Sequence, residues 1–543
     1  MKQPDASAKW ILLAGGGDED LENWRIRFDQ LERRISSFPD LAPFIGVNLQ
    51  QQSTLDSALA LLERCDGNMP ILAIIDADLN SINSDPNLDS PAVQLMRHLR
   101  QQARIPVLVN TEDPAESVLR CVLECAERQL WSNKTPRGET IDRALAVALN
   151  NLVESNKHRR LIIRVAPNSI TYRIMFGAYT YTPREKPYVT PLTVNQLFQD
   201  AENYTPITRE TNWLKDVSEL ARASFNHMIS EPLGPAMVSL IERIYHWDTS
   251  PPDDAPLLDL RFEFNLDEYG GARYFSLPFE LFCTQQENLN ERHYLCRQIP
   301  MARRLHLDEC IASNDADRTF INGKTKKRLL FIGIDFEGQI LIEAEDGAPT
   351  TARSQSVESL PSIVEEERLL RTLAAQSNGG LVVEVAETSN LRGIALIEYL
   401  QTKVTDGNYD ILHFAGHSIT IGSTTALIVP GETQSLGQQI SMHMVRKWIK
   451  DGHCKLLVLS SCSAASPLAA RIAMEGGAMG MLAFRWPVDD SQCTRFIKHF
   501  YEEFCKPSNK HGFAGAYRRA CEGTHAEKPW LPTWASAVAV VRD

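Results

Sequence analysis

Short apolar runs alternate with amphipathic stretches at both ends of the chain, and this alternation predicts α/β structure. In residues 1–136 the stretches Leu55–Arg64 and Ala92–Arg100 place their apolar positions at helical spacing. Parallel strands that are buried on both faces read as continuous apolar runs. The pattern therefore predicts a doubly wound parallel α/β domain. Its strand candidates are Trp10–Ala14, Phe44–Leu49, Ile71–Ile75 and Ile105–Val109.

The same alternation returns in residues 326–543, after a polar segment at 311–327. It predicts a second α/β domain with a parallel sheet at its core. Residues 338–362 carry glycine, proline, serine, threonine and acidic side chains, so we expect a long exposed loop there. The strand candidates are Arg328–Ile334, Leu381–Val385, Tyr409–Phe414, Leu456–Ser460, Gly480–Phe484 and Ala535–Val541.

The middle of the chain divides into two parts. Residues 137–160 predict one amphipathic connector helix, which either mediates dimerisation or packs on its own domain. Residues 161–325 predict a mixed α/β region with helices around 207–247. Its strand candidates are Leu161–Val165, Leu258–Phe264 and Tyr294–Ile299.

Composition narrows the class of protein. With 543 residues, 43% of them hydrophobic, the chain can bury several cores. A net charge of −13 argues against a nucleic-acid binder along the whole chain. The 11 cysteines form no C-x-x-C pair, which fits the reducing cytoplasm better than a disulfide framework. No apolar run approaches the ~18 residues of a membrane span, and we expect no cofactor and no metal.

Two of the apolar runs end in reactive side chains. His417 follows Gly416 after one run, and Cys462 follows Ser461 after another, 45 residues later. Reactive groups in open α/β sheets lie at the carboxyl ends of strands. If the two strands are neighbours, an imidazole and a thiol meet there, as a cysteine nucleophile and a histidine base require. The backbone N–H groups of Cys462 and Ser418 are candidates for the oxyanion hole.

Two other interpretations of these residues stay open. Cys462 can be a buried structural cysteine and His417 a hydrogen-bonded core histidine. His413, His417 and Cys462 can also hold a metal, although the sequence shows no fourth ligand. His413 itself lies inside an apolar run, which favours a buried supporting role.

Several segments resemble the CHAT group of caspase-like peptidases, relatives of caspases and separase. The segments Asp410–His417, Leu459–Cys462, Phe484–Asp490 and Trp534–Val540 stand in the order and spacing of that group. Upstream, Leu277–Leu281 and the stretch from Tyr294 to Arg303 are similar to its first half, so the resemblance covers roughly residues 161–543.

The resemblance implies a cysteine endopeptidase that cuts a protein substrate, with His417 as base and Cys462 as nucleophile. It also implies an activating or inhibiting protein partner, and for some members a role in bacterial antiphage defence. The chain departs from the group at Ser418, where a glycine usually follows the histidine, and at Ser463–Ser466, where a small acidic or polar segment is usual.

Side chains near the strand ends are candidates for the substrate pocket. An acidic pocket favours a basic residue before the scissile bond, and an apolar pocket favours an apolar one. One of Asp489 and Asp490 is expected to cap the helix that begins near Ser491. The candidates are Asp335, Glu337, Asp489 and Asp490 for the acidic pocket, and Phe484 and Trp486 for the apolar one.

The amino-terminal domain resembles a response-regulator receiver at three positions. Asp76 stands where receivers carry the phosphoacceptor, Thr111 the switch hydroxyl and Lys134 the phosphate-binding lysine. The acidic pair that holds magnesium is replaced by Ala14–Gly17, and acidic residues follow only at 18–20. Magnesium binding is then weak. We therefore expect a degenerate receiver used for docking or dimerisation, with phosphorylation control as the alternative.

The sequence thus predicts a receiver-like regulatory domain (1–136), a linker helix (137–160), the first half of a CHAT-like region (161–325) and a caspase-like catalytic domain (326–543). The rival hypothesis is a catalytically silent signalling scaffold that binds partners through both α/β domains. A homodimer remains open in both cases. We expect a cytoplasmic protein with a protein substrate and without direct nucleic-acid binding.

Overall fold

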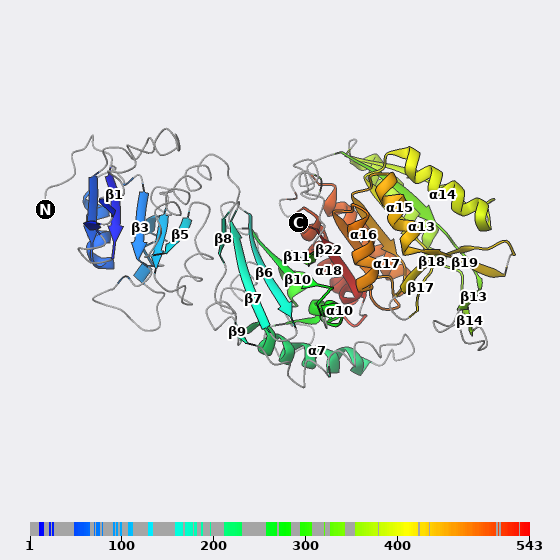
Figure 1. The fold of residues 1–543 in the computed structure, drawn as a ribbon, viewed down its shortest axis with the longest axis horizontal. Helices are drawn as coiled ribbons and strands as arrows, with labels where there is room; N and C mark the ends of the chain where they lie inside the picture. The colour runs from blue at the N-terminus through cyan, green and yellow to red at the C-terminus, as the bar shows by residue number, and fades with distance from the viewer. Residues whose placement is uncertain are drawn as a thin grey trace. The chain divides into compact units, whose positions relative to one another are not determined.

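The structure is a computed structural model that divides into two compact units (Figure 1). It describes residues 257–306 and 326–542, apart from 269–270, 284–293, 343–352, 378–379, 422–423, 434, 507–508, 510–511 and 532. Earlier in the chain it describes 10–15, 48–65, 72–76, 107–111, 129–133, 158–166, 169–176, 179–181, 186–187 and 211–230, with a few single residues elsewhere.

Five parallel strands form the sheet of the first unit. Their order, β2-β1-β3-β4-β5, is one of the common doubly wound orders and confirms the predicted parallel α/β structure. Helix α2 (Leu55–Arg64) packs Ala58 and Leu62 into the core cluster that includes Trp10. The strands are β1 (Trp10–Ala14), β2 (Asn48–Gln52), β3 (Leu72–Asp76), β4 (Val107–Thr111) and β5 (Gln129–Asn133). Strand β2 shares Asn48 and Leu49 with the predicted strand and continues through the polar residues 50–52, which an apolar run does not mark. Residues 44–47 of the prediction lie outside the described residues.

The second unit is built on one long mixed sheet in the order β15-β12-β16-β20-β21-β22-β11-β10-β6-β7. Strands β15, β12, β16, β20 and β21 are mutually parallel, whereas β22 runs antiparallel to β21 and parallel to β11. The sheet therefore continues across the predicted boundary at 325/326. The strands are β6 (His158–Ala166), β7 (Ser169–Phe176), β10 (Leu257–Asn265), β11 (Met301–His306), β12 (Lys327–Gly333), β15 (Leu381–Val385), β16 (Ile411–Ala415), β20 (Leu456–Ser460), β21 (Gly480–Phe484) and β22 (Ala537–Val541).

Helices cover the parallel part of this sheet in two groups. Every residue of β16, β20 and β21 is buried, which requires cover on both faces. Helix α13 packs on α17 and α17 on α18, whereas α14 packs on α15 and α15 on α16 (Figure 1). The helices are α13 (Ser362–Gln376), α17 (Asp490–Phe504), α18 (Gly512–Glu527), α14 (Gly393–Gly407), α15 (Met442–Asp451) and α16 (Pro467–Glu475).

A second, five-stranded sheet lies in the order β14-β13-β19-β18-β17. The prediction of a long exposed loop at 338–362 is therefore wrong, because β13 and β14 in this segment pair antiparallel and α13 begins at Ser362. The apolar Ile340 is buried, which explains why a polar-looking segment forms a strand. The strands are β13 (Gly338–Ile342), β14 (Arg353–Val357), β17 (Ser418–Ile421), β18 (Thr424–Pro430) and β19 (Leu436–Ser441).

Two other predicted elements differ from the structure. The run predicted as a strand at Tyr294–Ile299 forms a short helix, α11 (Leu295–Gln298), because a short apolar run does not distinguish strand from buried helix. Residues 158–160, predicted as the end of the connector helix, belong to β6. The rest of that predicted helix lies outside the described residues.

A buried ionic cluster joins the first half of the second unit to the end of β21. The guanidinium of Arg303 in β11 donates to the carbonyls of Phe275 (3.0 Å) and Leu277 (2.8 Å) and to the carboxylate of Glu280. Arg485 donates to the same carboxylate at 3.0 Å. Burial opposes ionisation of Glu280, but the two guanidinium groups outweigh it and lower its pKa. The cluster therefore anchors the segment that follows β21.

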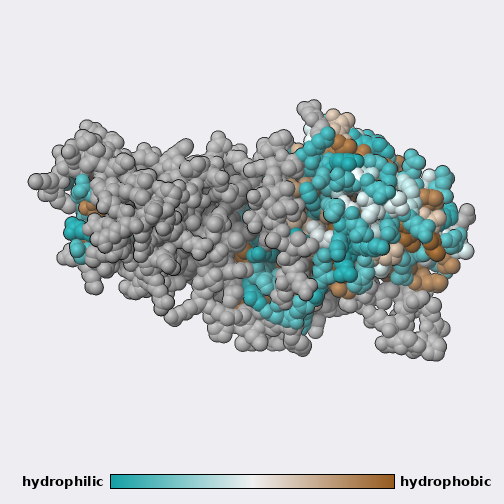
Figure 2. Space-filling model, turned by 45° about the horizontal axis from the view of Figure 1, so that its top comes forward, coloured by the Kyte–Doolittle hydropathy of each residue, from teal (hydrophilic) through white to brown (hydrophobic). Residues whose placement is uncertain are grey.

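The described surface of the second unit is mostly hydrophilic on the face that Figure 2 shows, with separate hydrophobic patches. Single exposed apolar side chains are normal for a folded protein. Among the described residues, no helix is both long and apolar enough to cross a membrane. The large exposed apolar side chains are Leu341, Val364, Val382, Ile394 and Trp530.

Candidate active site

His417 and Cys462 follow two neighbouring parallel strands. Ala415, the last residue of β16, is in register with Ser460, the last residue of β20. Each reactive residue stands two positions beyond its strand, and Gly416 N–H donates to the carbonyl of Ser460 at 3.3 Å. The structure thus places both residues at the same edge of the sheet, which is the arrangement that the sequence pattern requires.

Gly416 allows the close packing that precedes His417. A Cβ at this position would lie 3.0 Å from the carbonyl oxygen of Ile334 and 3.0 Å from the ring of Phe414. The N–H of Ile334 donates to the carbonyl of Ala415 at 2.8 Å, so the segment after β12 lies directly against the turn. A larger residue at 416 would push His417 away from β12.

The imidazole of His417 is oriented by a backbone carbonyl. Its Nε2 lies 2.8 Å from the carbonyl oxygen of Glu358, a residue between β14 and α13. A carbonyl only accepts, so Nε2 carries the proton and donates it. In the neutral ring the other nitrogen, Nδ1, is then the free acceptor. The carbonyl therefore leaves Nδ1 as the atom that can take a proton from a thiol.

The Cys462 thiol lies in a partly buried position beside Val488. Its Sγ accepts the N–H of Val488 at 3.4 Å. Burial and the nearby charge of Asp490 raise the pKa of the thiol, and the Val488 N–H does not offset them. His417 and Cys462, both within the described part of the chain, share no hydrogen bond. The thiol of this state is therefore protonated and needs a base before it can act as a nucleophile.

The turn that carries Cys462 is strained and held by β17. Ser463 has a φ of 56°, a left-handed conformation that costs a non-glycine residue roughly 1–2 kcal/mol. The hydroxyl of Ser418 donates to the Cys462 carbonyl, and that of Thr420 donates to the Ser463 carbonyl at 2.7 Å. These bonds fix the turn against the strand that follows His417.

Ser418 presents its backbone N–H away from its own sheet. The N–H of Ile428 donates to the carbonyl of His417 at 3.0 Å, so these two residues form a hydrogen-bonded pair of the β17–β18 ladder. The next residue of such a ladder points its N–H outward. Because β17 is the edge strand among the described strands of its sheet, the Ser418 N–H is available to an oxyanion.

A buried polar network lies beneath the two strand ends, and of its members the sequence indicated only His413, as a buried supporting residue. His413 in β16 hydrogen-bonds Glu366 (2.7 Å) and the hydroxyl of Tyr501 (3.0 Å). The hydroxyl of Ser460 in β20 donates to the other oxygen of Glu366 at 3.0 Å. The network ties β16 and β20 to α13 and α17. Its signal in the sequence is a carboxylate, Glu366, on the apolar face of a helix.

The contacts of His413 argue against the interpretation in which His413, His417 and Cys462 hold a metal, because both of its ring nitrogens already have protein partners. His413 is fully buried and turned to α13 and α17. It lies four residues before His417, roughly 13 Å along an extended chain. Within the described ranges no group of three histidine, cysteine or acidic residues could hold a metal ion.

Three of the four acidic candidates for the substrate pocket accept hydrogen bonds from the protein itself. Asp489 takes the N-cap position of α17 that the sequence predicts for one aspartate, and accepts from Gln492 N at 3.1 Å. Asp490 accepts from Ser362 N at 2.8 Å, and Asp335 from Leu360 N at 2.7 Å. Glu337 is exposed.

The apolar candidates belong to the core. Phe484 is fully buried and packs edge-on against Phe496, and Trp486 is only 4% exposed. Neither presents an open apolar wall in this state. Their roles in substrate binding remain predictions, as do those of the aspartates.

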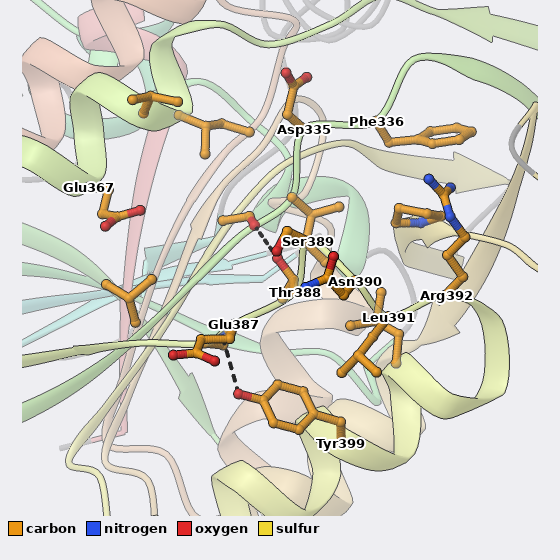
Figure 3. Close-up of a pocket in the computed structure, with 18 of the residues that line it drawn as sticks. Asp335, Phe336, Glu367, Glu387, Thr388, Ser389, Asn390, Leu391, Arg392 and Tyr399 are labelled. Atoms are coloured by element: carbon orange, nitrogen blue, oxygen red, sulfur yellow. Dashed lines mark hydrogen bonds between the residues drawn. The ribbon is translucent and has the colours of Figure 1, made fainter.

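A cavity of about 850 Å³ opens at the carboxyl ends of β12 and β15, between α13 and α14 (Figure 3). Asp335 and Glu337 line it from the segment after β12. On the other side the hydroxyl of Tyr399 accepts the N–H of Glu387 at 3.1 Å. The cavity lies at the end of β12, the strand that pairs with β16, at a position where α/β sheets commonly bind ligands.

The receiver-like positions are only partly within the described residues. Asp76 ends β3 and Thr111 ends β4, and these strands are neighbours with Asp76 in register with Asn110. Both positions therefore lie at one edge of the sheet. Lys134 and the acidic residues at 18–20 lie outside the described residues.

Comparison with known proteins assigns the family. A sequence model of the CHAT domain matches residues 252–541, more than half of the chain. The chain therefore belongs to the CHAT domain family, which confirms the resemblance derived from its motifs. The match begins later than the expected residue 161 and does not include the receiver-like region.

Solved structures of the Saccharomyces cerevisiae separase–securin complex are similar at 11% identity, with a TM-score of 0.36. In the 2.6 Å structure the similarity covers 74% of this chain and 31% of the other. In the 3.0 Å structure it covers 96% and 40%. The chain thus spans well under half the length of those proteins. No curated protein matches it.

Proposed function

We propose that this protein is a cysteine endopeptidase of the CHAT type that cleaves a protein substrate, with Cys462 as nucleophile and His417 as base. The observation that carries the proposal is the pairing of β16 with β20, which brings the two residues to adjacent strand ends. The Glu358 carbonyl supports it, because it leaves Nδ1 of His417 as the proton acceptor.

In the proposed reaction, Nδ1 of His417 takes the thiol proton and the thiolate attacks the carbonyl carbon of the scissile peptide. The N–H groups of Ser418 and Cys462 stabilise the resulting oxyanion. When the C–N bond breaks, His417 returns the proton to the leaving amine. Water, deprotonated by His417, then hydrolyses the thioester and releases the acid.

The described state corresponds to an idle enzyme in this proposal. The thiol pKa is raised, mainly by burial, and no hydrogen bond joins Cys462 to His417. An activating partner, or the receiver-like region, would bring the Cys462 thiol within hydrogen-bonding reach of the His417 imidazole. By resemblance to its family, the setting we propose is cytoplasmic and includes bacterial antiphage defence.

The absence of a hydrogen bond between the described residues Cys462 and His417 also favours the second candidate, a silent scaffold that binds partners through both α/β domains and never cleaves. Mass-spectrometric mapping of new protein N-termini in a lysate separates the two candidates, with wild type compared against His417→Ala. The peptidase predicts cleavage products that appear only with wild type. Identical N-termini from both proteins would favour the scaffold.

Ser418→Pro provides a test of the oxyanion hole. Proline removes the backbone donor, and an edge strand tolerates it where the N–H faces outward. We expect kcat/KM to fall by about 10²–10³-fold. Ser418→Ala is the matched control, since it keeps the N–H and loses only the bond to the Cys462 carbonyl. Equal activity of Ser418→Pro and Ser418→Ala would exclude Ser418 N–H as an oxyanion donor.

A further inference from the structure

A short segment, which we name the strap, runs from Glu358 to Ser362 between β14 and α13. Its first residue supplies the carbonyl that accepts Nε2–H of His417. Glu358 and Ser359 are exposed, so little core packing holds this part of the strap. The orientation of the imidazole therefore depends on whatever else fixes the strap.

Two carboxylates hold the strap in place. Asp335, just beyond β12, accepts the N–H of Leu360 at 2.7 Å on one oxygen and the hydroxyl of Ser359 at 2.9 Å on the other. Asp490, at the start of α17, accepts the N–H of Ser362 at 2.8 Å. The strap is thus fixed at Ser359, Leu360 and Ser362 by two carboxylates, one just beyond β12 and one at the start of α17.

We propose that Asp335, with Asp490 as a second anchor, is a positioning residue that holds the strap so that the Glu358 carbonyl orients His417. The inference rests on the proposed peptidase function and deepens it. Asp335 does not touch His417 directly and acts through the strap.

The proposal differs from the prediction that Asp335 recognises a basic substrate residue. In that prediction the charge of the carboxylate matters, because it pairs with the substrate. In the clamp only an acceptor oxygen matters. Asparagine keeps one acceptor for Leu360 N–H and removes the charge, so Asp335→Asn and Asp335→Ala separate the two roles.

Glu365 offers a matched control. It is an exposed carboxylate on α13, three residues after the strap, and it pairs with Arg368 on the same helix. It does not line the cavity, and the hydrogen bonds that hold the strap do not use it. Glu365→Gln therefore removes a nearby charge and leaves the strap unchanged.

The test uses peptidyl acyloxymethyl ketones with arginine or leucine in the P1 position, and mass spectrometry to confirm labelling at Cys462. For Asp335→Ala we expect the limiting rate of inactivation to fall by about 10²-fold, the cost of a misplaced catalytic group. The ratio of arginine to leucine labelling should stay that of wild type. Asp335→Asn should recover most of the rate, and Glu365→Gln should match wild type.

Loss of arginine preference in both Asp335 variants would overturn the proposal and support a substrate-binding acid. Hydrogen exchange of the peptide that spans the strap gives a second readout without catalysis. We expect faster exchange at 358–362 in Asp335→Ala and wild-type exchange in Asp335→Asn; unchanged exchange in Asp335→Ala would also overturn the clamp. Absence of Cys462 labelling in wild type, both alone and in the lysate in which cleavage products are mapped, would instead refute the peptidase itself.

Discussion

Cys462→Ala is expected to lower kcat/KM for the protein substrate by at least about 10⁴-fold. Alanine has no group that can attack the peptide carbonyl, so no thioester forms. The neighbouring contacts are small: the thiol accepts the Val488 N–H and donates weakly to the Val488 carbonyl at 3.8 Å. The folded structure should therefore survive, and a cleavage assay beside a thermal melt measures the two effects separately.

Cys505→Ala is the matched control for this variant. Among the described cysteines only Cys462 and Cys505 are partly exposed, and Cys505 caps the far end of α17. A general thiol reagent can reach both, but only loss of Cys462 should stop cleavage. Retained cleavage by Cys462→Ala at the same sites would assign the activity to another residue or to a contaminant.

Glu280→Gln is expected to lower the free energy of unfolding of the second unit by about 3–5 kcal/mol. The carboxylate is fully buried and is the shared acceptor of Arg303 and Arg485. A neutral amide leaves two buried guanidinium groups without a countercharge. Urea unfolding followed by fluorescence measures the change. Glu365→Gln, on the exposed face of α13, is the control and should leave the midpoint unchanged.

The free energies of unfolding of wild type and Glu280→Gln, compared across pH, give a further check of this ion pair. The pKa of Glu280 is lowered in the folded state from its ordinary 4.5. A lowered pKa contributes stability that is present above the unfolded pKa and is lost as the pH falls through the folded value. The difference between wild type and Glu280→Gln should therefore be constant near neutrality and narrow in acid. A difference that grows in acid would show that the ionised carboxylate is not the stabilising group.

The parallel strands of the second unit could be predicted from the sequence almost to the residue. Leu381–Val385, Leu456–Ser460 and Gly480–Phe484 form strands over the predicted ranges. Strands in the interior of a parallel sheet, such as β20 and β21, must be apolar on both faces, so the pattern is strong. The edge strand β15 also matches its predicted range, although only Leu381 in it is buried. The hairpin of β13 and β14 was missed because its strands are largely exposed and read as a polar loop.

The residues of the candidate site also fall into those that a sequence pattern marks and those that it does not. His417 and Cys462 could be recognised because each follows an apolar run, and reactive residues of open α/β sheets lie at the carboxyl ends of strands. Of their supporting residues the sequence indicated only His413, from its place inside an apolar run, because Glu358 and Glu366 are ordinary acidic residues in sequence. Asp335 and Asp490 were predicted as substrate contacts, and only the folded chain shows that both bind the strap.

The sequence by itself determined the family, the parallel α/β architecture and the two residues that we propose for the chemistry. These features depend on local hydrophobic periodicity and on motif order, which are properties of the chain. Only the tertiary structure decided how the site is held: the carbonyl on His417, the clamped strap and the neutral thiol in its partly buried turn. Each of these arises from contacts between segments far apart in sequence, and such contacts leave no local pattern to be read.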